Sequence, residues 1–229
     1  MGKLIVIDGL DGSGKATQTE ILKEKLEKMG VKTVKVSFPD YDSNSSAAVK
    51  MYLNGEVGSL EDVNVYAASS FYAVDRYISF KTKWEKYYND DYVVLCDRYA
   101  TSNICHQMPK LPENEQEAYM KWLYDYEFGL LGLPSPDMVI YLDMDPEISQ
   151  KLLMKRYEGD KAKKDIHEKN KNYLITCRKG ALKGAEHLGW NIIRCDDGNE
   201  PLSLENISER VFSAVDEAKI LEDICSNIR

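Results

Sequence analysis

The stretch VIDGLDGSGKATQTEIL, from Val6 to Leu22, decides the fold. Its apolar start, including Val6 and Ile7, ends a short run that is typical of a buried strand. Closely spaced glycines and Lys15 come next, and the residues after Lys15 have the periodicity of a helix. The stretch therefore predicts a strand, a tight glycine turn and a helix, in that order.

The turn from Gly9 to Lys15 matches the pattern G-x-x-x-x-G-K, which binds phosphate. Glycines allow the backbone N–H groups to turn inward around phosphate oxygens, in dihedrals that a Cβ would oppose. The start of the helix adds partial positive charge, and the lysine reaches the β- and γ-phosphates. We expect ATP to be bound by Gly9, Leu10, Asp11, Gly12, Ser13, Gly14, Lys15, Ala16 and Thr17.

Ala16 departs from the usual pattern, in which this position supplies a hydroxyl ligand to Mg²⁺. Thr17 cannot be assumed to replace it, because one helical step rotates a side chain by about 100°. Mg²⁺ dehydrates reluctantly and is well served by carboxylates and water. The predicted metal residues are therefore Asp11, inside the turn, and Asp97, which ends the apolar run YVVLCD.

The remaining chain alternates between strand-like and helix-like segments. Short runs rich in apolar and β-branched residues predict strands at 4–8, 33–38, 92–97, 138–143 and 191–196. Helical periodicity occurs at 16–29, 61–88, 113–131, 146–157, 167–187 and 203–224. This order predicts an α/β, three-layer, doubly wound P-loop NTPase fold with a central five-stranded parallel sheet, as a single domain over residues 1–229.

Composition excludes several classes of function. The chain has 229 residues and a net charge of −8, which argues against binding to nucleic acid or to an anionic membrane surface. No apolar run approaches the roughly 20 residues that a membrane-spanning helix needs. The five cysteines are dispersed, which favours reduced thiols and a cytoplasmic location.

A second anionic site is indicated by two Asp-Arg pairs. Tyr72, Asp75 and Arg76 share one helical face, although such a face is also compatible with an ordinary solvated surface. Arg98 follows the strand-terminal Asp97 near the glycine turn, where a cation is costly to bury without an anion. The planar guanidinium of Arg98 suits bidentate binding of phosphate. Two arginines together with an aromatic side chain therefore predict a planar ligand that carries a phosphate, which is a nucleotide.

The segment from 151 to 173 contains eight Lys or Arg against four Asp or Glu in an otherwise acidic chain. One interpretation is the charged surface of a helix. The other is a lid, at about 151–172, that closes over ATP, excludes water and brings Arg156 or a lysine to the transferred phosphoryl group.

Taken together, the motifs resemble the thymidylate (dTMP) kinase family of P-loop nucleoside-monophosphate kinases. The resemblance extends from Leu4 to about Asp196 and is carried by DGLDGSGKATQ, FPDY at 38–41, YAVDR at 72–76, DRYATSN at 97–103 and GLPSPD at 132–137. It implies an Mg²⁺-dependent enzyme that transfers the γ-phosphoryl group of ATP to dTMP, with a homodimeric assembly that the helix at 61–88 could support.

The resemblance also implies roles for single residues. Lys15, Asp11, Arg98 and Arg156 would be catalytic. Tyr72 would stack on thymine, Arg76 would hydrogen-bond the base, Asn103 would help to recognise it, and Arg98 would bind the acceptor phosphate. The predicted substrate-binding set is Phe38, Tyr41, Tyr72, Arg76, Arg98, Asn103, His106 and Gln107. In the lid, Arg156 and Asp165 match a basic and an acidic position of the family.

Some positions depart from the family. The segment Asp40-Tyr41-Asp42 lacks an arginine that many relatives carry, while His106 and His167 stand where tyrosines occur in relatives. His106 therefore puts the preference for deoxyribose in doubt. Three alternatives stay open: another monophosphate acceptor (dUMP, CMP or AMP), a free deoxynucleoside acceptor, and a nucleotide-binding regulator that has lost phosphoryl transfer.

Overall fold

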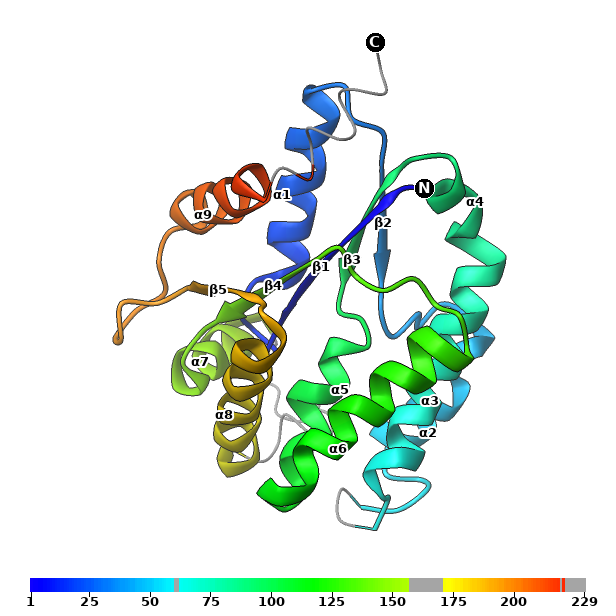
Figure 1. Ribbon diagram of the computed structural model, residues 1–229. Coiled ribbons are helices and arrows are strands. Elements are labelled where there is room, and N and C mark those ends of the chain that lie inside the picture. Colours follow the sequence, from blue (N-terminus) through cyan, green and yellow to red (C-terminus); the bar gives the residue numbers. More distant parts are fainter. Residues whose placement is uncertain (60–61, 157–170, 219, 221–229) are drawn as a thin grey trace.

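The computed structural model describes residues 1–59, 62–156, 171–218 and 220. Its centre is a five-stranded parallel sheet in the order β2-β3-β1-β4-β5 (Figure 1). The strands are β1 (Lys3–Gly9), β2 (Thr33–Ser37), β3 (Val93–Asp97), β4 (Met138–Asp143) and β5 (Asn191–Arg194). The expected doubly wound α/β fold is confirmed.

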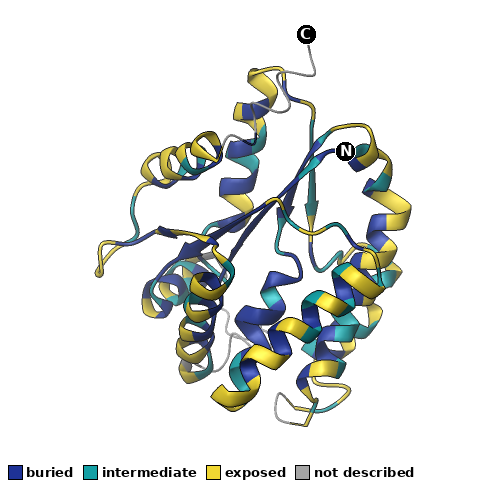
Figure 2. Cartoon of the chain, in the orientation of Figure 1, coloured by how far each residue is buried: buried dark blue, intermediate teal, exposed yellow. Residues whose placement is uncertain are grey.

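The two faces of the sheet build two cores, because successive side chains of a strand point to opposite faces. On β1, Ile5 and Ile7 pack with residues of α1 (Lys15–Lys28) and α9 (Leu204–Glu217). Leu4 and Val6 pack instead with residues of α3 (Val65–Ser79), α5 (Thr101–His106), α6 (Glu113–Tyr124) and α8 (Lys171–Leu188). Figure 1 shows these three layers, and Figure 2 shows that the central strands are buried while the outer helix faces are exposed.

Several helical segments differ from the expectation. The helix predicted at 61–88 consists of α3, a π-helical turn at Phe80–Trp84 and α4 (Glu85–Asn89). A second π-helical turn, Asp125–Leu130, continues α6, and α7 (Pro146–Arg156) begins at the proline as expected. Two short helices, α2 (Ala47–Leu53) and α5, were not predicted. They are seven and six residues long, too short for helical periodicity to reveal them.

Candidate active site

The predicted phosphate loop connects β1 to α1, and its glycines are required by geometry. Gly12 and Gly14 have φ of +83° and +92°, a region that favours glycine. A Cβ on Gly12 would lie 2.5 Å from the carbonyl oxygen of Ser149, at the start of α7, and one on Gly9 would lie 2.8 Å from that of Leu142. Side chains here would push the loop away from the elements that support it.

The loop presents unused backbone donors. The amides of Gly12, Gly14 and Lys15 donate no hydrogen bond to any residue that the structure describes. They lie at the start of a 14-residue helix, whose dipole adds partial positive charge. Such a cluster of donors binds anions, and a phosphate group is the anion that it fits best.

Lys15 is folded back over this loop. Its Nζ donates to the carbonyl oxygen of Leu10 at 3.0 Å and lies 3.7 Å from Oδ1 of Asp11. Burial lowers the pKa of Lys15, and the nearby Arg98 guanidinium lowers it further, against the opposing charge of Asp11. These contacts position the ammonium group at the loop.

The two residues after Lys15 offer no internal substitute for the missing hydroxyl. Ala16 and Thr17 are both exposed, whereas the hydroxyl of Thr19 is buried and donates to the carbonyl oxygen of Lys15 at 2.8 Å. Thr19 is therefore committed to its own helix. A metal ion at this site has to rely on carboxylates, phosphate oxygens and water.

Arg98 lies directly beside the phosphate loop. It follows β3, which pairs with β1, and its amide donates to the carbonyl oxygen of Ile7 at 3.1 Å. Its φ is +67°, a left-handed conformation that costs a residue other than glycine about 1–2 kcal/mol. Strained backbone of this kind is concentrated at functional sites.

Carboxylates surround the guanidinium of Arg98. Nη2 forms an ion pair with Asp11, and Nη1 lies 3.6 Å from Oδ1 of Asp8. Nη1 also lies 3.1 Å from Oγ of Ser102 and 3.3 Å from Nε2 of His106. Burial opposes the effect, but Asp11 and then Asp8 raise the pKa of Arg98, while Arg98 holds the pKa of Asp11 well below its ordinary value. The anion expected beside Arg98 is supplied within the chain by these acids.

The position of Asp8 near the end of β1 predicts that it lies at the ligand-binding edge of the sheet with Asp97 and the glycine turn, although no site role was predicted for it, and the structure shows that it organises this region. It is fully buried and accepts hydrogen bonds from the amide of Gly9 at 2.8 Å, from Oγ1 of Thr101 at 2.6 Å and from Oγ of Ser102 at 2.9 Å. It thus joins the phosphate loop to α5. Its position at the end of β1, beside the glycine turn, is the only sequence signal that could have identified it.

Arg76 is buried rather than part of a solvated helix face. Its Nε and Nη2 donate to the two carboxylate oxygens of Glu127 at 2.7 and 2.5 Å, and Nη1 lies 3.5 Å from the carbonyl oxygen of Tyr99. The Nδ2 of Asn103 donates to Oε1 of the same Glu127 at 3.3 Å. The structure therefore brings Arg76 and Asn103 together, and it adds Glu127, which sequence reasoning missed.

Tyr72 lies one helical turn before Arg76 on α3. Tyr52, on α2, packs edge-on against its ring with 6.3 Å between centroids. Gln107 is fully buried, and its Nε2 lies 3.4 Å from the hydroxyl of Tyr52. Gln107 therefore contacts this aromatic pair through Tyr52. Among the residues that the structure describes, no hydrogen bond connects Gln107 directly to Arg76 or Arg98.

The residues of FPDY have different surroundings. Phe38 is buried against Tyr99, with ring centroids 6.0 Å apart, and its amide donates to the carbonyl oxygen of Asp97 at 3.0 Å. Tyr41 is about half exposed. The carboxylate of Asp75 fixes the loop between Phe38 and Tyr41, because it accepts a hydrogen bond from the amide of Asp40 at 2.8 Å. Phe38 therefore packs in the core, whereas Tyr41 remains accessible.

Most of the predicted lid lies outside the described residues. Asp165 and His167 fall in the segment 157–170, and only the backbone of Arg156 belongs to the described part of α7. The lid and the role of Arg156 stay predictions.

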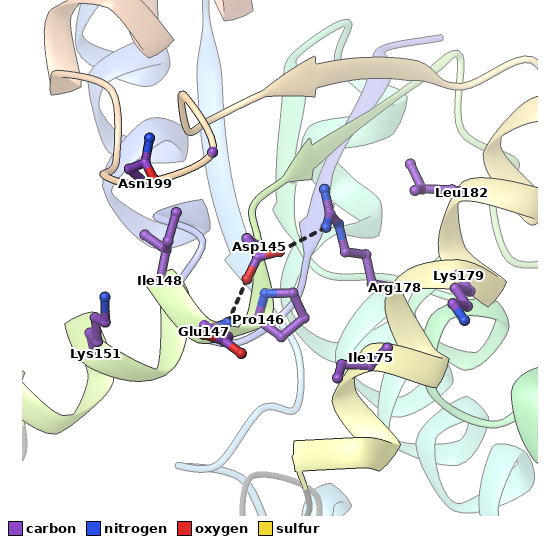
Figure 3. A pocket seen from close by; sticks show the side chains of 11 residues that line it. Asp145, Pro146, Glu147, Ile148, Lys151, Ile175, Arg178, Lys179, Leu182 and Asn199 are labelled. Atoms are coloured by element: carbon purple, nitrogen blue, oxygen red, sulfur yellow. Dashed lines mark hydrogen bonds and ion pairs between the residues drawn. The ribbon is translucent and has the colours of Figure 1, made fainter.

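A cavity of about 470 Å³ lies between the start of α7, α8 and the loop at 198–199 (Figure 3). Arg178 closes its inner side, with Nη1 3.2 Å from Oδ2 of Asp145 and Nε 2.6 Å from Oδ1 of Asp143. Asp196, two residues after β5, pairs with Arg194 at 2.6 Å. Asp143, at the end of β4, and Asp196 are thus held in ion pairs at this edge of the sheet.

Comparison with known proteins agrees with the phosphate-binding geometry of the site. The family model described as thymidylate kinase matches residues 7–206. The chain belongs to the thymidylate kinase family.

Relatives in this family support the assignment. The thymidylate kinase of Mycobacterium tuberculosis (strain H37Rv) is 32% identical over 169 residues, covering 73% of this chain and 78% of the relative. That of Brachyspira hyodysenteriae is 28% identical over 221 residues, covering 96% of both chains. A solved structure of Candida albicans thymidylate kinase has a TM-score of 0.68 at 19% identity and covers 96% of this chain and 93% of that one, which supports the fold.

Membership of the thymidylate kinase family makes the chain an ATP-dependent phosphotransferase that acts on dTMP, as the sequence motifs predicted. ATP and dTMP are its substrates. None of the described helices is long and apolar enough to cross a membrane.

Proposed function

We propose that this chain carries out ATP + dTMP → ADP + dTDP at the junction of the phosphate loop and Arg98. The observation that carries the proposal is the placement of these two anion-binding groups on adjacent strands, β1 and β3. Phosphoryl transfer depends mainly on positioning and on neutralising charge, and this arrangement supports both. The acceptor phosphate oxygen attacks the γ-phosphorus in line with the leaving ADP.

The residues divide the work between the two substrates. The loop amides and Lys15 bind the phosphates of ATP, and Arg98 binds the phosphate of dTMP. Lys15 and Arg98 then spread the negative charge of the transition state, with Arg156 added from the predicted lid. Arg76 and Asn103 read the base, and Tyr72 stacks on it.

Mg²⁺ fits the donor set of this site. The side-chain carboxylate of Asp97, at the carboxyl end of β3, accepts no hydrogen bond from the described residues, so its oxygens are available. No group of three or more metal-binding side chains occurs among the described residues, which suits an ion that retains water and phosphate oxygens as ligands. We propose that Asp97 and Asp11 would hold Mg²⁺, which would supply neutralisation of phosphate charge when bound.

A panel of acceptors tests the function. We expect rapid Mg²⁺-dependent formation of dTDP from dTMP, slower reaction with dUMP, and at most traces with CMP, AMP or thymidine, because Arg98 is proposed to bind the acceptor phosphate, and Arg76 and Asn103 to read thymine. Labelled ATP and separation of the products measure each reaction, and EDTA should abolish all of them. Equal rates with thymidine and dTMP would contradict the proposed role of Arg98.

We also propose a homodimer that is formed through α3. Tyr66, Val74, Tyr77 and Ile78 lie along one side of this helix, and each is between 38% and 47% exposed. A stripe of this kind on a surface helix is typical of a symmetric interface, since it is costly to leave in water.

The dimer is tested by placing charge in that stripe. Val74→Glu should convert a dimer into a monomer in size-exclusion chromatography with light scattering, because a buried unpaired carboxylate strongly opposes association. Met29→Glu, at a 51% exposed position after α1, is the matched control and should remain dimeric. A monomeric wild-type chain at micromolar concentration would contradict the proposal.

The cytoplasmic location stays a prediction. It is supported by the cysteines, since Cys96, Cys105, Cys177 and Cys195 are free, buried thiols in the described part of the chain.

A further inference from the structure

Glu127 connects the two residues that are proposed to read the base. Arg76 comes from α3, Asn103 from α5 and Glu127 from the π-helical turn Asp125–Leu130. The three side chains belong to residues only 1%, 2% and 0% exposed. π-Helical turns occur frequently at functional sites, and this one carries the carboxylate to which both other side chains donate.

The carboxylate determines which way the amide of Asn103 faces. A carboxylate paired with a guanidinium accepts hydrogen bonds and donates none, so the NH₂ group of Asn103 has to face Glu127. The amide oxygen is then turned the other way. It accepts no hydrogen bond from the described residues and is not among their fully buried unpartnered atoms, so this oxygen has its acceptor capacity left for a ligand although Asn103 is only 2% exposed. Asn103 therefore presents an acceptor.

The same carboxylate determines the plane of Arg76. Two of the five N–H groups of the guanidinium donate to Glu127, and a third lies near the carbonyl oxygen of Tyr99. The remaining N–H groups of Arg76 keep a fixed direction, because the two hydrogen bonds to Glu127 prevent the guanidinium from rotating. Arg76 therefore presents donors beside the acceptor of Asn103.

A donor beside an acceptor matches one class of pyrimidine. Thymine and uracil have an acceptor at O4 and a donor at N3–H, whereas cytosine has an amino donor at position 4 and an acceptor at N3. We propose that Glu127 is a positioning residue that sets base selectivity, because it orients Arg76 and the amide of Asn103 to accept 4-oxo pyrimidines and to reject cytosine. This inference rests on the proposed function and deepens it.

Two substitutions of Glu127 test the inference. Glu127→Gln removes the charge and can accept or donate toward Asn103, so the amide of Asn103 is free to flip. Glu127→Asp keeps a carboxylate for Arg76, but it is one methylene shorter and withdraws from the 3.3 Å contact with Asn103. The aspartate variant retains the counterion of a buried arginine and therefore provides a test if the glutamine variant does not fold.

The measured quantity is the ratio of kcat/KM for dTMP to kcat/KM for dCMP. We expect both variants to lower this ratio by about 10- to 100-fold, through a higher KM for dTMP and a lower KM for dCMP, with little change in the KM for ATP. Asp143→Asn is the matched control, because it removes the carboxylate of another bidentate pair, the part-buried pair with Arg178, and should leave the ratio unchanged.

A double variant separates orientation from simple loss of stability. In the background of Asn103→Ala, which has no amide to orient, Glu127→Gln should lower the ratio further by a smaller factor than it does alone. The inference about Glu127 would be overturned if Glu127→Gln lowered the ratio by the same factor with and without Asn103→Ala, or if both Glu127 variants kept the wild-type ratio. Either result would leave the proposed function intact. A wild-type chain that makes no dTDP from dTMP would instead overturn the proposed function on which it rests.

Discussion

Lys15→Ala should lower kcat by about 10²- to 10³-fold and leave the dissociation constant of dTMP nearly unchanged. Lys15 is positioned at the phosphate loop, where its Nζ donates a hydrogen bond to the carbonyl oxygen of Leu10. When ATP binds, Nζ can donate to a phosphate oxygen instead. Removing a charge that stabilises the transition state typically has an effect of this size. Coupled detection of ADP measures kcat, and calorimetry measures the binding of dTMP.

Lys15→Ala should not lower the stability of the folded state. Because the pKa of Lys15 is lowered on folding, the unfolded chain binds its proton more tightly, so the charged lysine costs stability at neutral pH. Lys15→Ala should therefore have a melting temperature equal to or above that of the wild type. Lys23→Ala, at a part-exposed position on α1 where the lysine pairs with Glu27, is the control and should retain normal turnover. Near-normal kcat in the Lys15 variant would remove this residue from the mechanism.

Arg98→Ala is expected to have the second large effect, a loss of about 10³-fold in kcat/KM for dTMP. A bidentate guanidinium–phosphate contact would be lost, in a site where water cannot replace it fully. Arg98→Lys should recover only part of the activity, because an ammonium group keeps the charge without the planar fork. Initial rates at limiting dTMP measure both variants.

Arg98→Ala should also change how stability depends on pH. Arg98 lowers the pKa of Asp11 on folding, so Asp11 stabilises the fold above its ordinary pKa, near 4, and this contribution disappears as pH falls through the lower folded value. In Arg98→Ala the acid-side decrease should be smaller, although the protein is less stable at neutral pH. Urea unfolding between pH 3 and pH 7 measures this.

Arg194→Ala provides the comparison for Arg98. It breaks an ion pair at the end of β5, with Asp196, instead of at the end of β3. It should lower stability without a comparable loss of kcat/KM for dTMP. An equal loss in both variants would mean that Arg98 acts through the fold and not through the acceptor phosphate.

The sheet could be predicted from the sequence because buried parallel strands are nearly continuous apolar runs, and each expected strand lies within two residues of the observed bounds at both ends. The phosphate loop was equally clear, since glycine spacing directly reflects backbone requirements at Gly12 and Gly14. The short helix α5 was not visible, because its sequence TSNICH begins with residues that favour caps and turns.

The partners of the charged side chains could not be predicted. Glu127 lies 51 residues from Arg76, and no local pattern records a contact that only the packing of three helical elements creates. Similarly, the sequence placed a cation beside a strand-terminal acid at Arg98 and led us to expect a ligand anion. The folded chain supplies Asp11 and Asp8 as well, because a cation that is largely withdrawn from water is costly without internal counterions.

The pairing of β1 with β3 has a consequence for engineering. Parallel hydrogen bonding holds these two strands about 4.8 Å apart, so it fixes the separation of Asp8, near the end of β1, and Arg98, directly after β3, and no side-chain replacement alters that spacing. The distance between the two substrates is therefore a property of main-chain geometry. Exchanging side chains in this pocket can change which nucleotide is accepted, but a new transfer distance would require a different strand register.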